Sequence, residues 1–417
     1  MRLFFILFLF AAVIAAPLFA QSIEFSGQVR ERSEFDDRRF YEDAHHDVYH
    51  QLRSRLRATA TLNEQVQAVV EVQDARMYGS GMGTMNYGAS FFDLRQGYID
   101  VDGLADGVLG FRLGRQVLSY GNERLLGAID WSNLGQSFDA GVLRLTAGDI
   151  RIDAIGAALQ RNLPYPTYLR DHFLAGVWAM WTPERRRNTV QAFFLYDHPA
   201  MTSDRDRQNR MTAGVHAGGQ FFAFDYEVDA AVQMGDHFTG DQQADINANM
   251  VGVRLGYTFP SLAGLRIGVG YDRLSGRDAD NPEDYTVFNT LYGTNHKFYG
   301  YMDYFTVIPA HTAGMGLQDM LVQLSIAPIE GFKLGADIHL FSTASDPADF
   351  PNEFNGTSRS IGTEVDVTAK WIVARAVHMT LGYSVFSGQP DRILLHGPSG
   401  NATDLTNWAY LMTSVNF

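Results

Sequence analysis

Arginine occupies every second position of one short stretch, at Arg53, Arg55 and Arg57. On a β-strand this spacing places all three guanidinium groups on one side, because successive side chains point to opposite faces. The opposite face, at positions 52, 54, 56, 58, 60 and 62, is nearly all apolar. A guanidinium group offers two parallel hydrogen bonds to a carboxylate, so the chemistry that this row suggests is the binding of anions.

The same alternation places further charged side chains on the polar faces of other predicted strands. Most of the arginines cluster in the N-terminal third of the chain, whereas the acids concentrate later, which predicts a basic wall facing an acidic wall. A simpler alternative is that Asp225, Glu227 and Asp229 pair with the three arginines and neutralise them. The side chains predicted on polar faces are Arg30, Arg32, Arg95, Arg112, Arg144, Arg151, Arg254, Asp225 and Glu227.

The elements that must position these residues are β-strands of about ten residues, separated by turn residues. Glycine occurs 40 times and aromatic residues make up 13% of the chain, which suits a β-rich protein. The alternation predicts eighteen strands, at 22–33, 49–63, 65–76, 91–101, 107–117, 138–147, 149–160, 172–182, 189–198, 209–218, 221–235, 247–259, 264–275, 317–327, 332–344, 358–371, 377–388 and 405–417.

Short and long connections alternate between these strands, and both termini fall on the short-turn side. An even number of strands with short periplasmic turns and long extracellular loops is typical of a transmembrane antiparallel β-barrel in the bacterial outer membrane. An arginine facing lipid at mid-bilayer costs about 2–4 kcal/mol. We therefore expect Leu52, Leu56 and Leu62 to face lipid and the arginines to face the interior.

The N-terminus resembles a secretory signal peptide over residues 1–20, with an unbroken apolar run from Leu3 to Ala20. The remainder, 21–417, is expected to be a single barrel domain. The chain ends in Phe417 on an alternating strand, which resembles the signal that the outer-membrane assembly machinery recognises. A net charge of −14 argues against nucleic acid as a partner, and the absence of cysteine excludes thiolate metal sites and disulfides.

Two segments leave alternatives open. Gln96 shares the alternation of Phe92 and Leu94, so the strand is bulged there or its phase differs. The segment 295–307 is assigned to a long loop, because a nineteenth strand would move the C-terminus to the other side. Within that loop His296, Lys297 and Asp303 either form a constriction of the pore or pack over the loops.

Neither an enzyme nor a metal protein is predicted. The stretch 42–50 contains His45, His46 and His50, but adjacent histidines rarely meet one ion without a scaffold. The acidic stretch 277–284 lacks the spaced ligands of a calcium loop. No Gly-x-Ser-x-Gly motif occurs, and no cofactor is expected.

Several segments resemble the alginate export family of outer-membrane proteins: "GFRLGRQVLSYGNERLLGAIDWSNLGQSFDAGVLRL" at 110–145, and the segments 52–76, 91–101 and 296–305. The resemblance implies an eighteen-stranded barrel whose arginine-rich constriction passes a polyuronate by diffusion. It assigns pore arginines to Arg53, Arg55, Arg57, Arg95, Arg115 and Arg144, and a loop-and-strand motif to Gly114, Gln116, Gly121, Arg124, Asp130, Trp131 and Asp139. Alternation alone does not place Arg115 inside, since it shares a face with Leu113.

The sequence thus predicts a monomeric, anion-selective channel for an acidic polysaccharide such as alginate or related uronate oligomers. Rings of arginine are one means by which pores select anions. Two other functions stay open. One is a general or small-solute porin for uptake, and the other is a closed structural or adhesive surface barrel.

Overall fold

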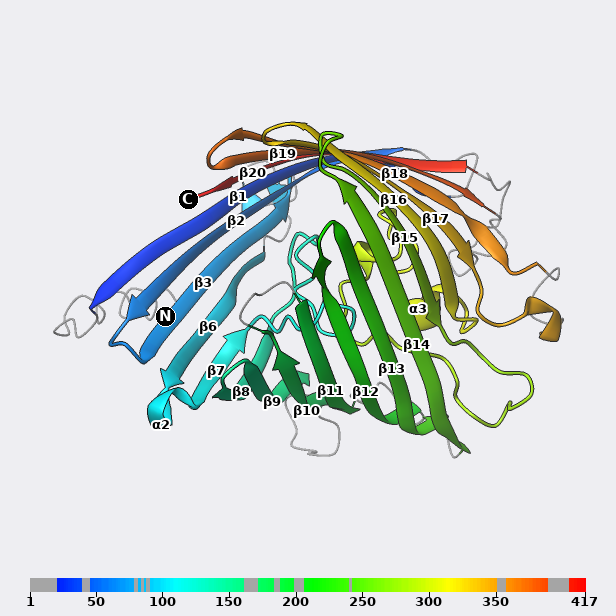
Figure 1. The fold of residues 1–417 in the computed structure, drawn as a ribbon, viewed down its shortest axis with the longest axis horizontal. Helices are drawn as coiled ribbons and strands as arrows, with labels where there is room; N and C mark the ends of the chain where they lie inside the picture. Colours follow the sequence, from blue (N-terminus) through cyan, green and yellow to red (C-terminus); the bar gives the residue numbers. More distant parts are fainter. Residues whose placement is uncertain are drawn as a thin grey trace.

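The computed structural model describes residues 21–39, 46–78, 82–83, 86–87, 91–160, 172–183, 188–198, 206–239, 242–350, 358–388 and 405–417. Within them, eighteen antiparallel strands form one sheet, and the first strand pairs with both the second and the last (Figure 1). The sheet is therefore closed, which confirms the predicted eighteen-stranded barrel. The predicted signal peptide at 1–20 lies outside the described residues and stays a prediction.

Each predicted range corresponds to one strand of the barrel, and the range 221–235 also includes Phe221, the last residue of β12. β12 extends to Phe221, beyond its predicted end at 218, so that its turn to β13 falls at Phe222 and Ala223. The barrel strands are β1 (Ser22–Asp37), β2 (Asp47–Thr61), β3 (Val66–Met77), β6 (Phe91–Gly103), β7 (Leu109–Gln116), β8 (Phe138–Ala147), β9 (Ile150–Gln160), β10 (His172–Trp181), β11 (Asn188–His198), β12 (Asp206–Phe221), β13 (Phe224–Thr239), β14 (Gln242–Phe259), β15 (Leu265–Leu274), β16 (Leu317–Ile329), β17 (Phe332–Ser342), β18 (Ser360–Ala374), β19 (Val377–Gly388) and β20 (Leu405–Asn416).

The outer face of the barrel is apolar and the inner face is polar. Leu56, Val232 and Val269 are each about half exposed on the outside, whereas Arg53 and Asp319 are fully buried on the inside. This distribution follows from the two-residue alternation of each strand, which turns apolar side chains toward lipid.

Two long connections fold into the barrel. The segment between β7 and β8 (residues 117–137, hereafter the first inward loop) and the segment between β15 and β16 (residues 275–316, the second inward loop) lie within the ring of strands (Figure 1). They carry buried apolar side chains such as Leu126, Phe288 and Phe305, which form a core inside the barrel. The second loop contains η1 (Asn295–Lys297) and α3 (Ile308–His311) and no strand at 295–307, as predicted.

The remaining elements are short. They are α2 (Leu104–Gly107), η2 (Pro347–Asp349) and a separate hairpin of β4 (Met82–Gly83) and β5 (Asn86–Tyr87). None of the helices in the described part of the chain is long and apolar enough to cross a bilayer.

A bulge in β6 resolves the ambiguity at Gln96. Glu71 of β3 pairs with Gln96, but the next residue, Val72, pairs with Leu94, so Arg95 is the extra residue of β6. Arg95 and Gln96 are both buried, with 4% and 6% of their surfaces exposed, while Leu94 is exposed on the outside. The bulge therefore adds a second inward polar side chain at the level where Arg95 meets the first inward loop.

Candidate functional site

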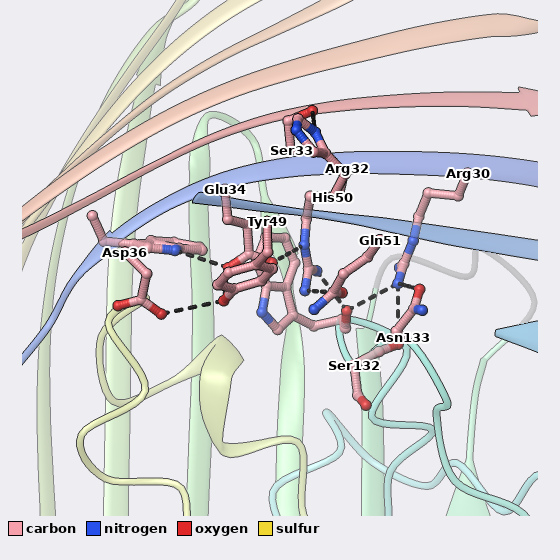
Figure 2. A network of polar contacts seen from close by, with 12 residues as sticks. Arg30, Arg32, Ser33, Glu34, Asp36, Tyr49, His50, Gln51, Ser132 and Asn133 are labelled. Carbon is pink, nitrogen blue, oxygen red and sulfur yellow. Dashed lines mark hydrogen bonds and ion pairs between the residues drawn. The ribbon is translucent and has the colours of Figure 1, made fainter. Parts of the chain in front are cut away.

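The first inward loop is held against the barrel wall by arginines that donate to its main-chain carbonyl oxygens. The Arg30 guanidinium donates to the carbonyl oxygen of Asp130 at 2.7 Å and to those of Trp131 and Ser132 at 3.2 and 3.1 Å. Arg53 donates to the carbonyl oxygens of Asp130 and Ser132 at 3.0 and 3.1 Å. Figure 2 shows Arg30 of β1 extending to this loop at Ser132 and Asn133. Arg32 of the same strand donates to the loop at the carbonyl oxygen of Trp131. Carbonyl oxygens thus satisfy much of the donor capacity of these buried cations.

The side chain of Asp130 lies against the same arginines. Its carboxylate oxygens are 3.2 Å from Arg53 Nη2, 2.6 Å from Arg55 Nη1 and 3.9 Å from Arg95 Nη2. This carboxyl is half exposed. Its partial desolvation by the surrounding protein would raise the pKa, but the charges of Arg53 and Arg55 outweigh that effect and lower the pKa below its ordinary value. We call Arg30, Arg53, Arg55 and Arg95 the arginine cluster.

The arginine cluster has more donors than the loop accepts. Four of its donors, Arg30 Nε, Arg53 Nε, Arg55 Nη2 and Arg95 Nε, are buried and have no hydrogen-bond partner among the described residues, although Glu71 lies 3.8 Å from Arg95 Nε. Two of them, Arg55 Nη2 and Arg95 Nε, belong to residues that border a cavity. A buried donor without an acceptor is costly, which makes these two atoms candidate contacts for a ligand. Both arginines line a cavity of about 690 Å³ that reaches the short-turn end of the barrel, together with Ser26, Gly27, Gln28, Arg57, Glu71, Gln96, Tyr98, Arg112, Val117, Asp130, Asn416 and Phe417.

The backbone of the first inward loop is strained next to this cluster. Ile129 has a φ of 47°, a left-handed conformation that a β-branched residue rarely adopts. Gly135 has a φ of 69°, and a Cβ atom there would lie 2.8 Å from Arg95 Nη2. Strain of this kind persists where the surroundings fix the conformation. Here the arginine contacts fix the loop, and Gly135 lets the backbone approach Arg95.

The second inward loop is joined to the first. Leu126 and Tyr292 form an isolated parallel bridge, and the Trp131 ring stacks on His296 with centroids 4.2 Å apart. His296 in turn contacts Asp303 at 2.7 Å, and Lys297 Nζ donates to the carbonyl oxygen of Asn122 at 3.0 Å. His296 and Lys297 therefore lie where the two loops meet, inside the barrel. The sequence left this placement open between a constriction and packing over the loops.

Arg124 is a central residue whose role sequence reasoning missed. Its fully buried guanidinium donates to Asp229 at 3.0 Å, to Asp272 at 2.7 Å and to the Tyr299 hydroxyl at 3.1 Å. Burial would lower its pKa, but Asp272, Tyr299 and Asp229 together raise it. It had appeared only as one position of the family motif. The apolar run LLGAI that directly follows Arg124 is a signal that could have indicated its burial but was not used.

The acids of the later strands do not pair with the arginines of β2. Asp225 binds Arg266 with contacts of 2.9 and 2.5 Å, and Glu227 lies 3.9 Å from Arg254. Asp229 binds Arg124 and His216. The alternative in which Asp225, Glu227 and Asp229 neutralise the arginine triplet is therefore wrong.

Asp225 and Glu227 help to line a second cavity of about 420 Å³ on the other wall. Arg254, which the sequence predicted on the polar face, also binds Asp272 at 2.9 Å and borders this cavity. The two cavities have contrasting linings, since the first is rich in arginine and the second mixes acids with bases. The second is lined by Asp225, Tyr226, Glu227, Arg254, Arg266, Tyr301, Gln323, Leu324, Ser325, Lys333, Gly335, Asp337, Asp366, Thr368 and Lys370.

Several other arginines that the sequence predicted on the polar faces are paired with acidic residues close to them in the barrel wall. Arg57 binds Glu71 at 2.7 Å with its side chain 37% exposed, and Arg151 binds Asp153 at 2.6 Å. Arg112 and Arg144 share Asp100. Arg32 binds Glu34 at 2.6 Å, donates to the carbonyl oxygen of Trp131 at 2.8 Å and lies over the Trp131 ring.

Arg115 departs from the expectation drawn from the family resemblance. It is on the same face of β7 as the exposed Leu113, in register with the exposed Asp139 of β8. Its guanidinium contacts Asp139 and Asp93 at 3.3 and 3.4 Å and donates to the Leu94 carbonyl oxygen at 2.8 Å. Placing Arg115 among the pore arginines was wrong, because the alternation of β7 turns it outward.

No group of three or more potential metal ligands converges in the described part of the chain. Of the histidine-rich stretch, Glu42, Asp43 and His45 lie outside the described residues. In the acidic stretch 277–284, Asp278 accepts hydrogen bonds from Asn281 and from the Asp280 amide, as in an ordinary turn.

Comparison with known proteins supports this architecture. A family model described as alginate export matches residues 21–388. No curated protein matches the chain. Solved barrels match over nearly their whole length at low identity, which shows the fold alone. OccAB1 of Acinetobacter baumannii has a TM-score of 0.64 at 12% identity, covering 97% of this chain and 98% of that one.

Two barrels of Pseudomonas aeruginosa are also similar. OccK8 (OprE) has a TM-score of 0.60 at 12% identity, and OpdK, in a structure with vanillate, has a TM-score of 0.61 at 10% identity. In both cases the match covers 96% of this chain and 99% of the other. The family match covers most of the chain, and the barrel fold agrees with it. The chain belongs to the alginate export family and is a β-barrel of the bacterial outer membrane.

Proposed function

We propose that the protein is a passive channel for carboxylate-bearing solutes, with acidic polysaccharides such as alginate, or related uronate oligomers, as the leading class. The observation that carries this proposal is the pair of unfilled donors, Arg55 Nη2 and Arg95 Nε, at a cavity of about 690 Å³. Planar guanidinium donors suit carboxylates, and cavities of this size accommodate small molecules.

The electrostatics of the cavity support an anion. Arg55, Arg57, Arg95 and Arg112 line it together with two acids, Glu71 and Asp130, which leaves positive charge in excess. In a closed barrel this charge acts across a narrow, low-dielectric space, where it attracts anions more strongly than at an open surface. We propose that solutes follow this wall past the junction of the two inward loops at His296 and Lys297.

A second candidate is the uptake of small carboxylates. The two inward loops cross the lumen and narrow it, which favours solutes smaller than a polymer. A similar barrel, OpdK, has been crystallised with vanillate, a small aromatic acid. Both candidates use the arginine-lined cavity, and they differ in the size of solute that passes.

The test is the reversal potential of single channels in planar bilayers under a potassium chloride gradient. The natural protein should favour chloride. The Arg55→Gln, Arg57→Gln double variant should lose much of that preference, because two cations leave the cavity. Arg53 is left in place, since it holds the first inward loop.

The matched control is the Arg76→Gln, Arg115→Gln double variant. It removes the same charge from the outer face, where Arg76 pairs with Asp74 and Arg115 with Asp139. This control should keep the natural selectivity. A natural protein that conducts no ions, or that favours potassium, would refute the proposed function.

A further inference from the structure

We propose that the Asp130 carboxylate is a tethered competitor for solute carboxylates at the arginine cluster, and that it keeps the residence time of an anionic solute short. This inference rests on the proposed function. It assigns a role in specificity and release to a loop residue, beyond the attraction of anions by arginine.

The first argument is that Asp130 occupies the position of a ligand. Its carboxylate contacts Arg53 and Arg55 at 3.2 and 2.6 Å, as a solute carboxylate would. The Arg53 side chain is buried and that of Arg55 is 12% exposed, whereas the Asp130 side chain is 51% exposed and lines the cavity of about 690 Å³. An exposed acid thus covers buried cations from the side that a solute would approach.

The second argument is that the loop does not depend on this carboxylate for its position. Arg30, Arg32 and Arg53 hold main-chain carbonyl oxygens of the loop. The side chain of Asn133 donates to the carbonyl oxygens of Leu52 and Arg76, and Gln73 donates to that of Leu134 at 2.9 Å. The carboxylate can therefore be exchanged for another while the backbone stays attached.

The third argument is the stoichiometry of charge and donors. Four arginines form the cluster, and Asp130 is the carboxylate that binds three of them. Arg55 Nη2 and Arg95 Nε, which are buried and have no hydrogen-bond partner among the described residues, offer donors to a second carboxylate that binds beside Asp130 or in its place. A solute therefore gains charge-assisted hydrogen bonds but must share or displace an internal partner.

Such competition has a functional consequence for a channel. Conduction requires a site that binds strongly enough to admit a solute and weakly enough to release it. Without Asp130 the buried arginines would bind a polyuronate too tightly for fast passage. With it, the return of the tethered carboxylate promotes release.

The experiment measures the duration of current blocks by trigalacturonate, a soluble uronate trimer, in planar bilayers. In the Asp130→Asn variant the blocks should last at least about ten times longer than in the natural protein, because the solute no longer competes with a tethered carboxylate for charge-assisted hydrogen bonds from the arginines. The Asp130→Glu variant keeps a carboxylate and should retain short blocks.

The matched control is Asp139→Asn, which removes one acid from the exposed outer face, where Asp139 pairs with Arg115. Its blocks should be as short as those of the natural protein. Equal block durations in the Asp130→Asn variant and the natural protein would overturn the proposal, as would longer blocks in the Asp139→Asn control. If either contrary result is found and the natural channel is anion-selective, this inference alone is overturned. If the natural channel is not anion-selective, the proposed function is overturned as well.

Discussion

At the scale of single residues, the interior is organised by arginines that donate hydrogen bonds to main-chain carbonyl oxygens and to carboxylates. Arg30 and Arg53 satisfy carbonyl oxygens of the first inward loop, while Arg124 joins Asp229, Asp272 and Tyr299. Burying a guanidinium group is tolerable where its donors are filled. The unfilled donors Arg55 Nη2 and Arg95 Nε belong to residues that line the arginine-rich cavity, and they therefore mark the place that we propose for a solute.

Arg124 provides a prediction at this scale. Replacing it with methionine leaves Asp229 and Asp272 buried with one partner fewer, so the free energy of unfolding should fall by about 3–5 kcal/mol. The measurement is chemical denaturation of the protein refolded in lipid vesicles. Current noise should also rise, because the first inward loop loses its hydrogen bond to Tyr299 of the second.

The control for this prediction is Arg359→Met. Arg359 and its partner Asp346 form an exposed pair, with 47% and 33% of their side chains accessible. An exposed pair contributes about 0–1 kcal/mol, so this variant should unfold close to the natural protein. Equal losses in the two variants would contradict the role given to Arg124.

At the scale of elements, the strands were predictable because each has one face in lipid and one in the barrel. This constraint imposes a two-residue period over ten or more positions, as in β2 and β18. The bulge at Arg95 was visible as an interruption of that period at Gln96, although its direction was not. The side of Arg115 also followed from the period, against the family resemblance.

The inward loops were not predictable in the same way. Their residues follow no period, and their positions depend on contacts between segments far apart in the chain, such as Leu126 with Tyr292 and Trp131 with His296. The partners of Asp225 and Glu227 were missed for the same reason. Acids pair with arginines on the strands nearest to them, here Arg266 and Arg254. Which strands are near is set by the order of strands around the barrel.

β16 offers a direct test of the two faces. Val322 is 40% exposed on the outside, and its neighbour Gln323 lines the cavity of about 420 Å³. The Val322→Lys variant should lose about 2–4 kcal/mol of unfolding free energy in lipid vesicles, because the lysine meets hydrocarbon.

The neighbouring Gln323→Lys variant serves as its control. The new lysine faces water and the acids Asp337 and Glu227, so the loss of stability should be much smaller. Similar losses at both positions would mean that β16 does not separate a lipid face from a polar face.

At the scale of the whole molecule, the barrel encloses two walls of different charge beneath a pair of joined loops. The arginine-rich wall comes from β1, β2, β3, β6 and β7, and the mixed wall from β13 to β18. The net charge of −14 gives no hint of this separation. It arises because the early strands contribute arginines to the interior and the late strands contribute acids.

The most direct measurement of the central claim is the flux of oligosaccharides into lipid vesicles that contain the purified protein. Trigalacturonate and the neutral trimer maltotriose are of similar size and differ in charge, so their rates of uptake separate anion passage from simple sieving. The account predicts faster uptake of trigalacturonate, with the difference reduced by the Arg55→Gln, Arg57→Gln variant. Exclusion of both trimers, or faster uptake of maltotriose, would contradict it.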